Sequence, residues 1–139
     1  MSESLGLIHA AATWFMVGLI RFVQVVHYPL FARVGADGFR EYSTSHQART
    51  TMVVGPVMLV EFVTAAALLV VEPGVLTIAG AVRLGLGWAS TFFVQVPLHG
   101  RLETRHDVAL VRRLVMTNWL RTWLWSARGV LALLLLSPS

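Results

Sequence analysis

Phe93-Val94-Gln95-Val96-Pro97-Leu98-His99 repeats, with small shifts, an earlier stretch of the same chain, Phe22-Val23-Gln24-Val25-Val26-His27-Tyr28-Pro29-Leu30. A second pair of segments, His46-Gln47-Ala48-Arg49-Thr50 and Asn118-Trp119-Leu120-Arg121-Thr122, is separated by 72 residues, close to the 71 residues that separate the two glutamines. Such nearly constant spacing indicates an internal duplication. In each half, an apolar segment ending in glutamine and histidine is followed by a polar connection and a second apolar segment.

The composition is typical of a membrane protein. Of the 139 residues, 56% are hydrophobic and 13% are charged, and the mean hydropathy is +0.69, whereas soluble domains carry about 25% charged residues. We therefore expect one integral membrane domain over residues 1–139. All eleven basic residues are scattered arginines, so despite a pI near 11.1 we expect lipid head groups and not nucleic acid as partners. The chain has no cysteine, which excludes disulfides and thiolate metal sites.

Four apolar segments are long enough to cross a bilayer, which needs about 20 mostly apolar residues. They cover about residues 5–26, 51–71, 75–98 and 117–136. The sequence therefore predicts an all-α four-transmembrane-helix bundle built from two parallel helix-hairpin repeats, about 5–71 and 75–136. We expect short amphipathic helices in the two polar connections. The first starts with Asp37 as N-cap and runs straight into the second span, and the second covers about 103–115.

Arginine positions predict the orientation of the bundle. The middle turn and both termini hold no arginine, whereas the two polar connections hold eight. The arginines of the connections are Arg33, Arg40, Arg49, Arg101, Arg105, Arg112, Arg113 and Arg121. The positive-inside rule places both connections in the cytoplasm and both termini outside. We expect a multi-pass protein of the cell membrane, specifically a bacterial inner membrane.

Opposite charges also occur inside the predicted spans. Glu61 and Arg83 each lie 11 residues from Glu72 at the hairpin turn, so antiparallel helices bring them to the same depth, about 16 Å from the turn. A lone charge at that depth costs at least a few kcal/mol, so we predict an ion pair. The pair either locks two helices or belongs to a binding site. Arg21 and Arg128 also lie inside the predicted spans. Together with Arg83 they give three arginines and one glutamate within the membrane, an excess of positive charge that suits an anionic ligand such as a carboxylate, a phosphate or haem propionates.

Polar residues recur in pairs spaced three or four residues apart, which places each pair on one helix face. The pairs are Gln24 and His27, Gln95 and His99, His46 and Arg49, and Asn118 and Arg121. Polar groups avoid lipid by facing other helices, so we predict one inward-facing polar site at the cytoplasmic end. The candidate catalytic residues are His27, His46, His99, Arg49 and Arg121, and the candidate substrate-binding residues are Gln24, Gln95, Asn118, Trp14, Trp88, Glu61 and Arg83.

Three histidines of this set suggest a cofactor. His27, His46 and His99 could form a copper, iron or zinc centre with an open position, or ligate haem axially. The alternative is three interfacial histidines wetted by lipid head groups, because no His-x-x-x-His or Glu-x-x-His spacing supports a metal. Trp14 and Trp88 lie deeper than an aromatic belt requires, so they either pack between helices or line a cavity for a flat ligand.

Val96-Pro97-Leu98-His99-Gly100-Arg101-Leu102, followed by Asn118-Trp119-Leu120-Arg121-Thr122, resembles the small four-helix membrane family that includes the fungal anthrone oxygenases and many bacterial proteins. That family has a Val-Pro-Leu-Asn-x-x-Leu run before a Trp-x-x-x-Asn-x-x-Arg-Thr run, so His99 and Leu114 stand where the family has Asn and Trp. The match covers roughly the last 45 residues. The resemblance implies oxidation of a flat polycyclic phenolic substrate.

Three functions follow as alternatives. The first is a membrane oxidoreductase acting on a lipophilic aromatic or quinone-like molecule that enters from the bilayer. The second is a haem- or metal-binding membrane protein, or a subunit of a larger complex, without turnover. The third is a small transporter, for which four spans would require a homo-oligomer.

Overall fold

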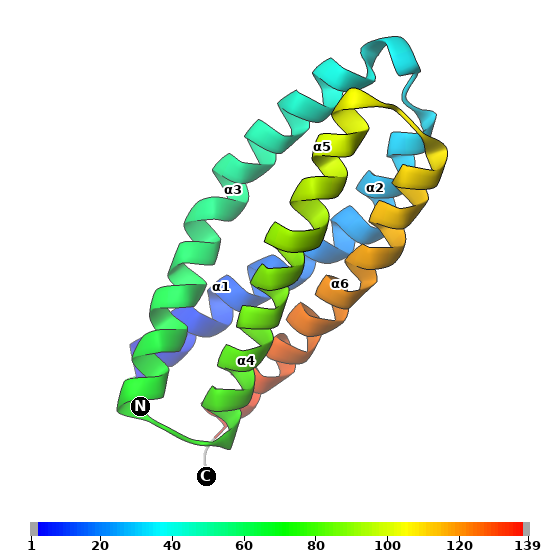
Figure 1. Cartoon of the computed structure of the whole chain (residues 1–139). Helices are drawn as coiled ribbons and strands as arrows, with labels where there is room; N and C mark the ends of the chain where they lie inside the picture. The colour runs from blue at the N-terminus through cyan, green and yellow to red at the C-terminus, as the bar shows by residue number, and fades with distance from the viewer. Residues whose placement is uncertain (1–2, 138–139) are drawn as a thin grey trace.

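The computed structural model describes residues 3–137, which form four long helical segments and no strand (Figure 1). The first segment combines α1 (Glu3–Phe22), the π-helical η1 (Val23–His27), α2 (Tyr28–Leu30) and the 3₁₀-helical η2 (Phe31–Arg33). The second is α3 (Ala36–Val71). The third combines α4 (Val75–Ser90), the π-helical η3 (Thr91–Gln95) and α5 (Val96–Thr104), and the fourth is α6 (Val108–Leu136). The all-α prediction is confirmed.

Three of the four segments are long and apolar enough to cross a membrane. They are Glu3–Arg33, Ala36–Val71 and Val75–Thr104. The fourth, α6, carries four arginines and does not belong to this group. Large apolar side chains on the outer faces, such as Phe62 at 51% and Phe93 at 81% exposure, give the bundle the surface of a membrane protein.

The polar connections agree with the sequence prediction in one respect and differ in others. The first polar stretch runs straight into the second span, as predicted, because both belong to the 36-residue α3, but the N-cap of this helix is Gly35, with Asp37 inside its first turn. The helix predicted over 103–115 is divided, because α5 ends at Thr104 and α6 begins at Val108. Asp107 causes the new start, since its carboxylate accepts a hydrogen bond from the Ala109 amide at 2.8 Å. The polar stretches therefore extend the long helices, and no separate amphipathic helix occurs within residues 3–137.

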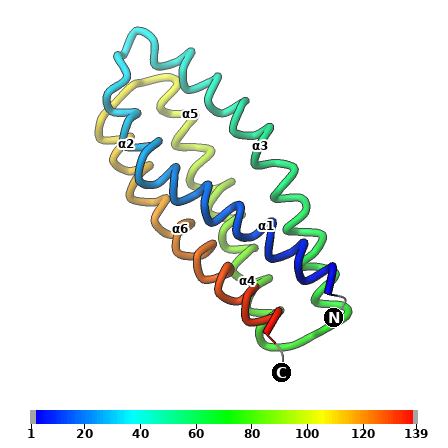
Figure 2. The backbone as a smooth tube through the Cα atoms, turned by 180° about the vertical axis from the view of Figure 1, so that it is seen from behind, coloured from blue at the N-terminus to red at the C-terminus, as the bar shows by residue number. Residues whose placement is uncertain are grey.

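The ends of the helices divide into two groups (Figures 1 and 2). The start of α1, the end of α6 and the turn between α3 and α4 lie at one end of the bundle, and the two polar connections lie at the other. Along its length α6 packs against both α1 and α4, while α1 also packs against α3. Polar residues near the two polar connections are therefore brought together from all four segments.

Each π-helical segment begins six residues before a proline, Pro29 in α2 and Pro97 in α5. A proline has no amide hydrogen, and its ring crowds the carbonyl four residues earlier, so an α-helical turn is poorly tolerated there. The chain widens instead, and the amide of Tyr28 donates to the Val23 carbonyl, five residues back. The amide of Val96 donates to the Thr91 carbonyl in the same way. These turns change the direction of the side chains that follow.

Two apolar clusters form the core. The cluster nearest the polar connections contains Val23, Tyr28, Phe31, Phe39, Leu98, Leu102, Val111 and Leu114. The other contains Met16, Val17, Ile20, Met58 and Trp125. Trp125 fits against α4 only because residue 87 is glycine, since a Cβ there would lie 2.7 Å from the indole ring. This close approach fixes the spacing of α4 and α6.

Replacing Gly87 by alanine should lower the free energy of unfolding by about 1–3 kcal/mol, because Trp125 is fully buried and has no room to shift. The matched control is Gly85→Ala on the same helix. A Cβ at position 85 meets no atom within 4 Å, so this change should be neutral or stabilise the helix by up to about 1 kcal/mol. Reversible unfolding in mixed micelles measures both. Equal stability of the two variants would contradict the packing described here.

Candidate functional site

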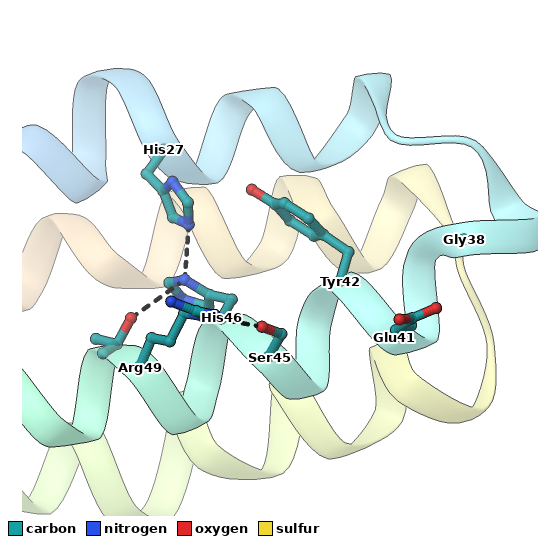
Figure 3. Close-up of a pocket in the computed structure, with 8 residues that line it drawn as sticks. His27, Gly38, Glu41, Tyr42, Ser45, His46 and Arg49 are labelled. Atoms are coloured by element: carbon teal, nitrogen blue, oxygen red, sulfur yellow. Dashed lines mark hydrogen bonds between the residues drawn. The ribbon is translucent and has the colours of Figure 1, made fainter.

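Two histidines from different segments share a hydrogen bond beside the polar connections. His27 lies at the end of η1 and His46 in α3, and Nε2 of His27 lies 2.7 Å from Nδ1 of His46 (Figure 3). Their ring centroids are 4.3 Å apart. The Thr50 hydroxyl lies 3.2 Å from the same Nδ1 atom. Both rings are half-buried, so this histidine pair is supported by the protein and still open to a ligand.

The histidine pair lies on the wall of an open groove of about 490 Å³, here named the histidine groove. Its lining residues are His27, Gly38, Glu41, Tyr42, Ser45, His46, Arg49 and Thr50. An apolar hollow of about 230 Å³ shares His27, His46, Arg49 and Thr50 with it and is completed by Leu19, Phe22, Val23, Val53 and Val54. The histidine pair therefore stands where a polar cavity meets an apolar one.

The groove carries one cation close to the histidine pair. Arg49 lies one turn along α3 from His46 and donates from Nε to the Ser45 hydroxyl at 3.3 Å. Glu41 lies away from the pair, toward the Gly38 end of the pocket (Figure 3). The electrostatic potential is thus more positive beside the histidine pair than at the Gly38 end of the groove, where Glu41 lies. A positive potential favours a ligand oxygen that carries or develops negative charge.

The third histidine lies behind the pair. His99 in α5 is 6% exposed, and its Nε2 atom lies 3.0 Å from the Tyr28 hydroxyl. Its ring centroid is 5.7 Å from that of His46. Phe31, which is fully buried, packs its ring edge against both His27 and His46 with centroids 5.2 Å apart in each case. Packing on Phe31 thus fixes the rings of the histidine pair.

A buried hydrogen-bond network, centred on Asn118 of α6, continues from this point into the bundle. Asn118 is fully buried and donates from Nδ2 to the Gln24 side-chain carbonyl at 2.9 Å. Its own carbonyl accepts a hydrogen bond from Nη1 of Arg121 at 3.0 Å. Gln24 also accepts from the Thr122 hydroxyl at 3.3 Å and donates to the Val115 backbone carbonyl at 3.1 Å. Each side chain of this network therefore forms a hydrogen bond, either with a residue one turn away on α6 or with a residue of the facing helix.

The eight residues predicted to form one site divide into two neighbouring groups. His27, His46 and Arg49 line the groove, whereas Gln24, Asn118 and Arg121 form the interior network. His99 stands between the groups, and Gln95 donates to the Thr117 hydroxyl at 2.9 Å. The prediction that Gln24 and His27 share a helix face is wrong, because the π turn directs Gln24 toward α6 and His27 toward α3.

The predicted ion pair of Glu61 with Arg83 is also wrong. Glu61 pairs with Arg128 of α6 at 2.5 Å and accepts a hydrogen bond from Nε1 of Trp125 at 3.1 Å. Arg83 instead donates to the Ala79 carbonyl of its own helix at 3.1 Å. Glu61 lies fifteen residues beyond His46 on α3, which is about 22 Å along the helix. Glu61 and Arg83 are therefore outside the histidine groove.

The two tryptophans of the predicted site lie elsewhere. Trp14, 42% exposed, lies against Gly129 of α6, and Trp88 lines a small apolar hollow between α3 and α4 together with Phe62. Neither belongs to the histidine groove. Both positions agree with the alternative that these tryptophans pack between helices.

A metal centre gains no support from the geometry. In residues 3–137, no group of three or more histidine, aspartate or glutamate side chains is arranged to hold a metal ion. Nε2 of His27 and Nδ1 of His46 face each other, and Nε2 of His99 faces Tyr28. One ring nitrogen of each histidine is therefore engaged in a hydrogen bond within the protein, and these three nitrogens do not converge on a common point.

Sequence reasoning missed Tyr28, Tyr42 and Thr50, all of which contact the histidines or line the groove. Tyr28 and Thr50 stand beside predicted site residues, and their position in the repeated stretches was the available signal. Tyr42 has no such neighbour. Comparison with protein-family models, with curated proteins and with solved structures found no match.

Proposed function

We propose that this integral membrane protein binds a lipophilic phenolic or quinone-like molecule in the histidine groove and exchanges a proton with its oxygen at His27 and His46. The observation that carries the proposal is the placement of the hydrogen-bonded histidine pair at the junction of the polar groove and the apolar hollow. A ligand with an apolar ring system and one oxygen would place each part in a matching environment.

The apolar hollow provides the route from the bilayer. Phe22 and Val53, which line it, are 55% and 49% exposed on the apolar outer surface. A ligand dissolved in lipid can reach the histidine pair along them without crossing water. Tyr42, which lines the groove beside His27, adds an aromatic wall for a flat ring.

The chemistry follows from the tautomers of the pair. A neutral imidazole carries one proton, so one histidine donates to the other and each retains one further ring nitrogen, Nδ1 of His27 and Nε2 of His46. In one tautomer the remaining nitrogen of His27 is unprotonated and accepts the phenol proton. The resulting imidazolium passes its Nε2 proton to His46, and the phenolate remains beside the Arg49 guanidinium.

Oxidation is the reaction that the resemblance to anthrone oxygenases implies, and a phenolate gives up an electron more readily than a phenol. We infer that an oxidoreductase reaction here would begin from the phenolate formed at the histidine pair. No observation on residues 3–137 favours a haem, metal or transport function over this proposal.

We also infer the orientation of the bundle. The polar connections lie together at one end of the molecule, and they hold most of the arginines (Figure 1). With that end in the cytoplasm, the histidine groove opens near the cytoplasmic membrane surface and both termini are outside. The similar placement of the two π turns before prolines agrees with a duplicated hairpin.

A lipophilic phenol tests the proposed function directly. 2-Naphthol, whose phenol and phenolate forms differ in absorption and fluorescence, should bind the purified protein in nanodiscs with an increased phenolate fraction. His27→Ala should weaken binding at least about tenfold, since it removes the hydrogen bond to the charged phenolate oxygen, and such a bond contributes about 1.5–3 kcal/mol. His46→Gln keeps a polar side chain and should bind without forming phenolate.

Arg83→Gln is the control, because Arg83 lies outside the groove and contacts the backbone of its own helix. It should leave the spectra unchanged. Equal binding and equal phenolate fraction in the wild-type protein and in His27→Ala would exclude the histidine groove as the site.

A further inference from the structure

A small cavity lies where all four helical segments meet, in the half of the bundle where α1 starts and α6 ends (Figure 2). His9 of α1 and Arg128 of α6 line its polar side, and its apolar wall includes Ala65 of α3, Gly80 of α4 and Ala132 of α6. The volume open to the centre of a water molecule is about 10 Å³. The cavity therefore has room for one water molecule or one monatomic ion of similar size.

Arg128 brings hydrogen-bond donors to this cavity that no protein group accepts. Its side chain is 2% exposed, and Nη1 donates to the carboxylate of Glu61. Nε and Nη2 are buried and have no hydrogen-bond partner within residues 3–137. A buried donor without an acceptor is costly, because it has lost its hydrogen bond to water and gained none in return. The two N–H groups therefore favour an acceptor in the cavity.

The hydrogen bonds around His9 determine which of its ring nitrogens carries the proton. Nδ1 of His9 lies 2.8 Å from the Thr64 hydroxyl oxygen. The Thr64 hydroxyl has a single hydrogen, which it directs to the backbone carbonyls of Val60 at 2.7 Å and Glu61 at 3.2 Å. Its oxygen therefore accepts from Nδ1 of His9. In the neutral ring the lone pair is then on Nε2, which is the nitrogen that can take up a second proton.

The charges around the cavity favour an anion only together with a proton. Arg128 of α6 is the cation that lines the cavity beside His9, and Glu61 of α3 balances it. The lining residues from α4 carry no charge, and Thr77 is the polar one among them. With His9 neutral, an anion would add an uncompensated charge inside the membrane-spanning bundle, and so would a proton alone. A proton on Nε2 and an anion beside it compensate each other.

We propose that this cavity binds one small monatomic anion, for which chloride is the probe, together with one proton on Nε2 of His9. The anion accepts hydrogen bonds from Nε and Nη2 of Arg128 and from Nε2 of the protonated ring. Proton and anion each strengthen the binding of the other, so the chloride Kd should fall about tenfold for each unit by which the pH is lowered. The site is separate from the histidine groove and does not depend on the proposed function.

The test follows histidine protonation by ¹⁵N NMR in the full chain, labelled at histidine and reconstituted in nanodiscs. Neutral and protonated imidazole rings give separate ¹⁵N shifts, and the signals that disappear in His9→Gln belong to His9. Chloride replaces gluconate, an anion too large for the cavity, at constant ionic strength. We expect chloride to convert His9 from the neutral ring protonated on Nδ1 to the imidazolium. The chloride concentration at half conversion should fall about tenfold per pH unit.

Two substitutions on α6 form a matched pair that tests the cavity itself. Ala132 is 2% exposed and lines the cavity, so leucine at this position should displace the anion and leave His9 neutral in chloride. Ala127→Leu makes the same change at a position that is not among the lining residues, and it should keep the conversion. Each variant is checked for an unchanged elution volume in detergent.

Three outcomes would overturn the proposal. One is a His9 ring whose ¹⁵N signals do not respond to chloride at any pH from about 5 to 8, which would mean that the cavity holds water alone. Another is conversion of His9 by gluconate as readily as by chloride. The third is full conversion in Ala132→Leu, which would place the anion outside the cavity.

Discussion

Replacing Glu61 by glutamine is expected to lower the free energy of unfolding by about 3–5 kcal/mol, because it leaves the Arg128 charge buried without its counter-ion. Glu61 is fully buried and Arg128 is 2% exposed, so water cannot replace the lost partner. Trp125 also loses the carboxylate that accepts from its indole. Arg128→Gln should have a loss of similar size, because it strands the carboxylate instead.

The double variant Glu61→Gln with Arg128→Gln should lose less stability than the sum of the two single variants, since no unpaired charge remains. Unfolding in mixed micelles followed by circular dichroism measures all three. Arg83→Gln is the matched control and should lose less than about 1 kcal/mol, because the hydrogen bond that Arg83 makes within residues 3–137 goes to a carbonyl of its own helix. A loss in Arg83→Gln as large as in Arg128→Gln would instead support the pairing predicted from depth alone.

Replacing Asn118 by leucine should be the second most damaging change, at about 2–4 kcal/mol. The side chain of Asn118 donates to Gln24 and accepts from Arg121. Leucine removes both hydrogen bonds in the interior, so the Gln24 carbonyl keeps the Thr122 hydroxyl as its partner and Nη1 of Arg121 loses its Asn118 acceptor. Leu120→Ala is a control on the same helix. Leu120 is 56% exposed on the outer face of α6, so its truncation should cost little.

The same unfolding assay checks this prediction. Gln24→Ala should share part of the loss, so that Gln24→Ala combined with Asn118→Leu costs less than the sum. Strictly additive losses would mean that Gln24 and Asn118 do not form the hydrogen bond described here.

Three of the four predicted spans are long and apolar enough to cross a membrane, and they were predictable because length and composition depend only on local sequence. The gathering of His27, His46 and His99 was predictable too, since each lies near the same end of its helix. The partner of Glu61 was not predictable from depth, because Arg83 and Arg128 both lie well inside the helical bundle. The choice between them depends on the rotation of each helix about its axis, which packing such as that of Trp125 against Gly87 determines.

The polar connections show a second limit of sequence reasoning. Polar composition suggested separate amphipathic helices, but composition does not indicate where one helix stops and another starts. The break between α5 and α6 depends on the extended backbone of Arg105 and Asp107 and on the cap that Asp107 provides. A single capping side chain therefore decided how the stretch 103–115 was divided.

The π turn before Pro29 acts like a one-residue insertion in a regular helix. At 3.6 residues per turn, one residue corresponds to a rotation of about 100°. A chain that kept Gln24, His27 and Pro29 but lost one residue from the π turn would aim Gln24 or His27 at a different helix. The histidine groove therefore depends on the number of residues before the proline as much as on their identity. Sequence motifs that ignore this spacing would group together chains that cannot build the same site.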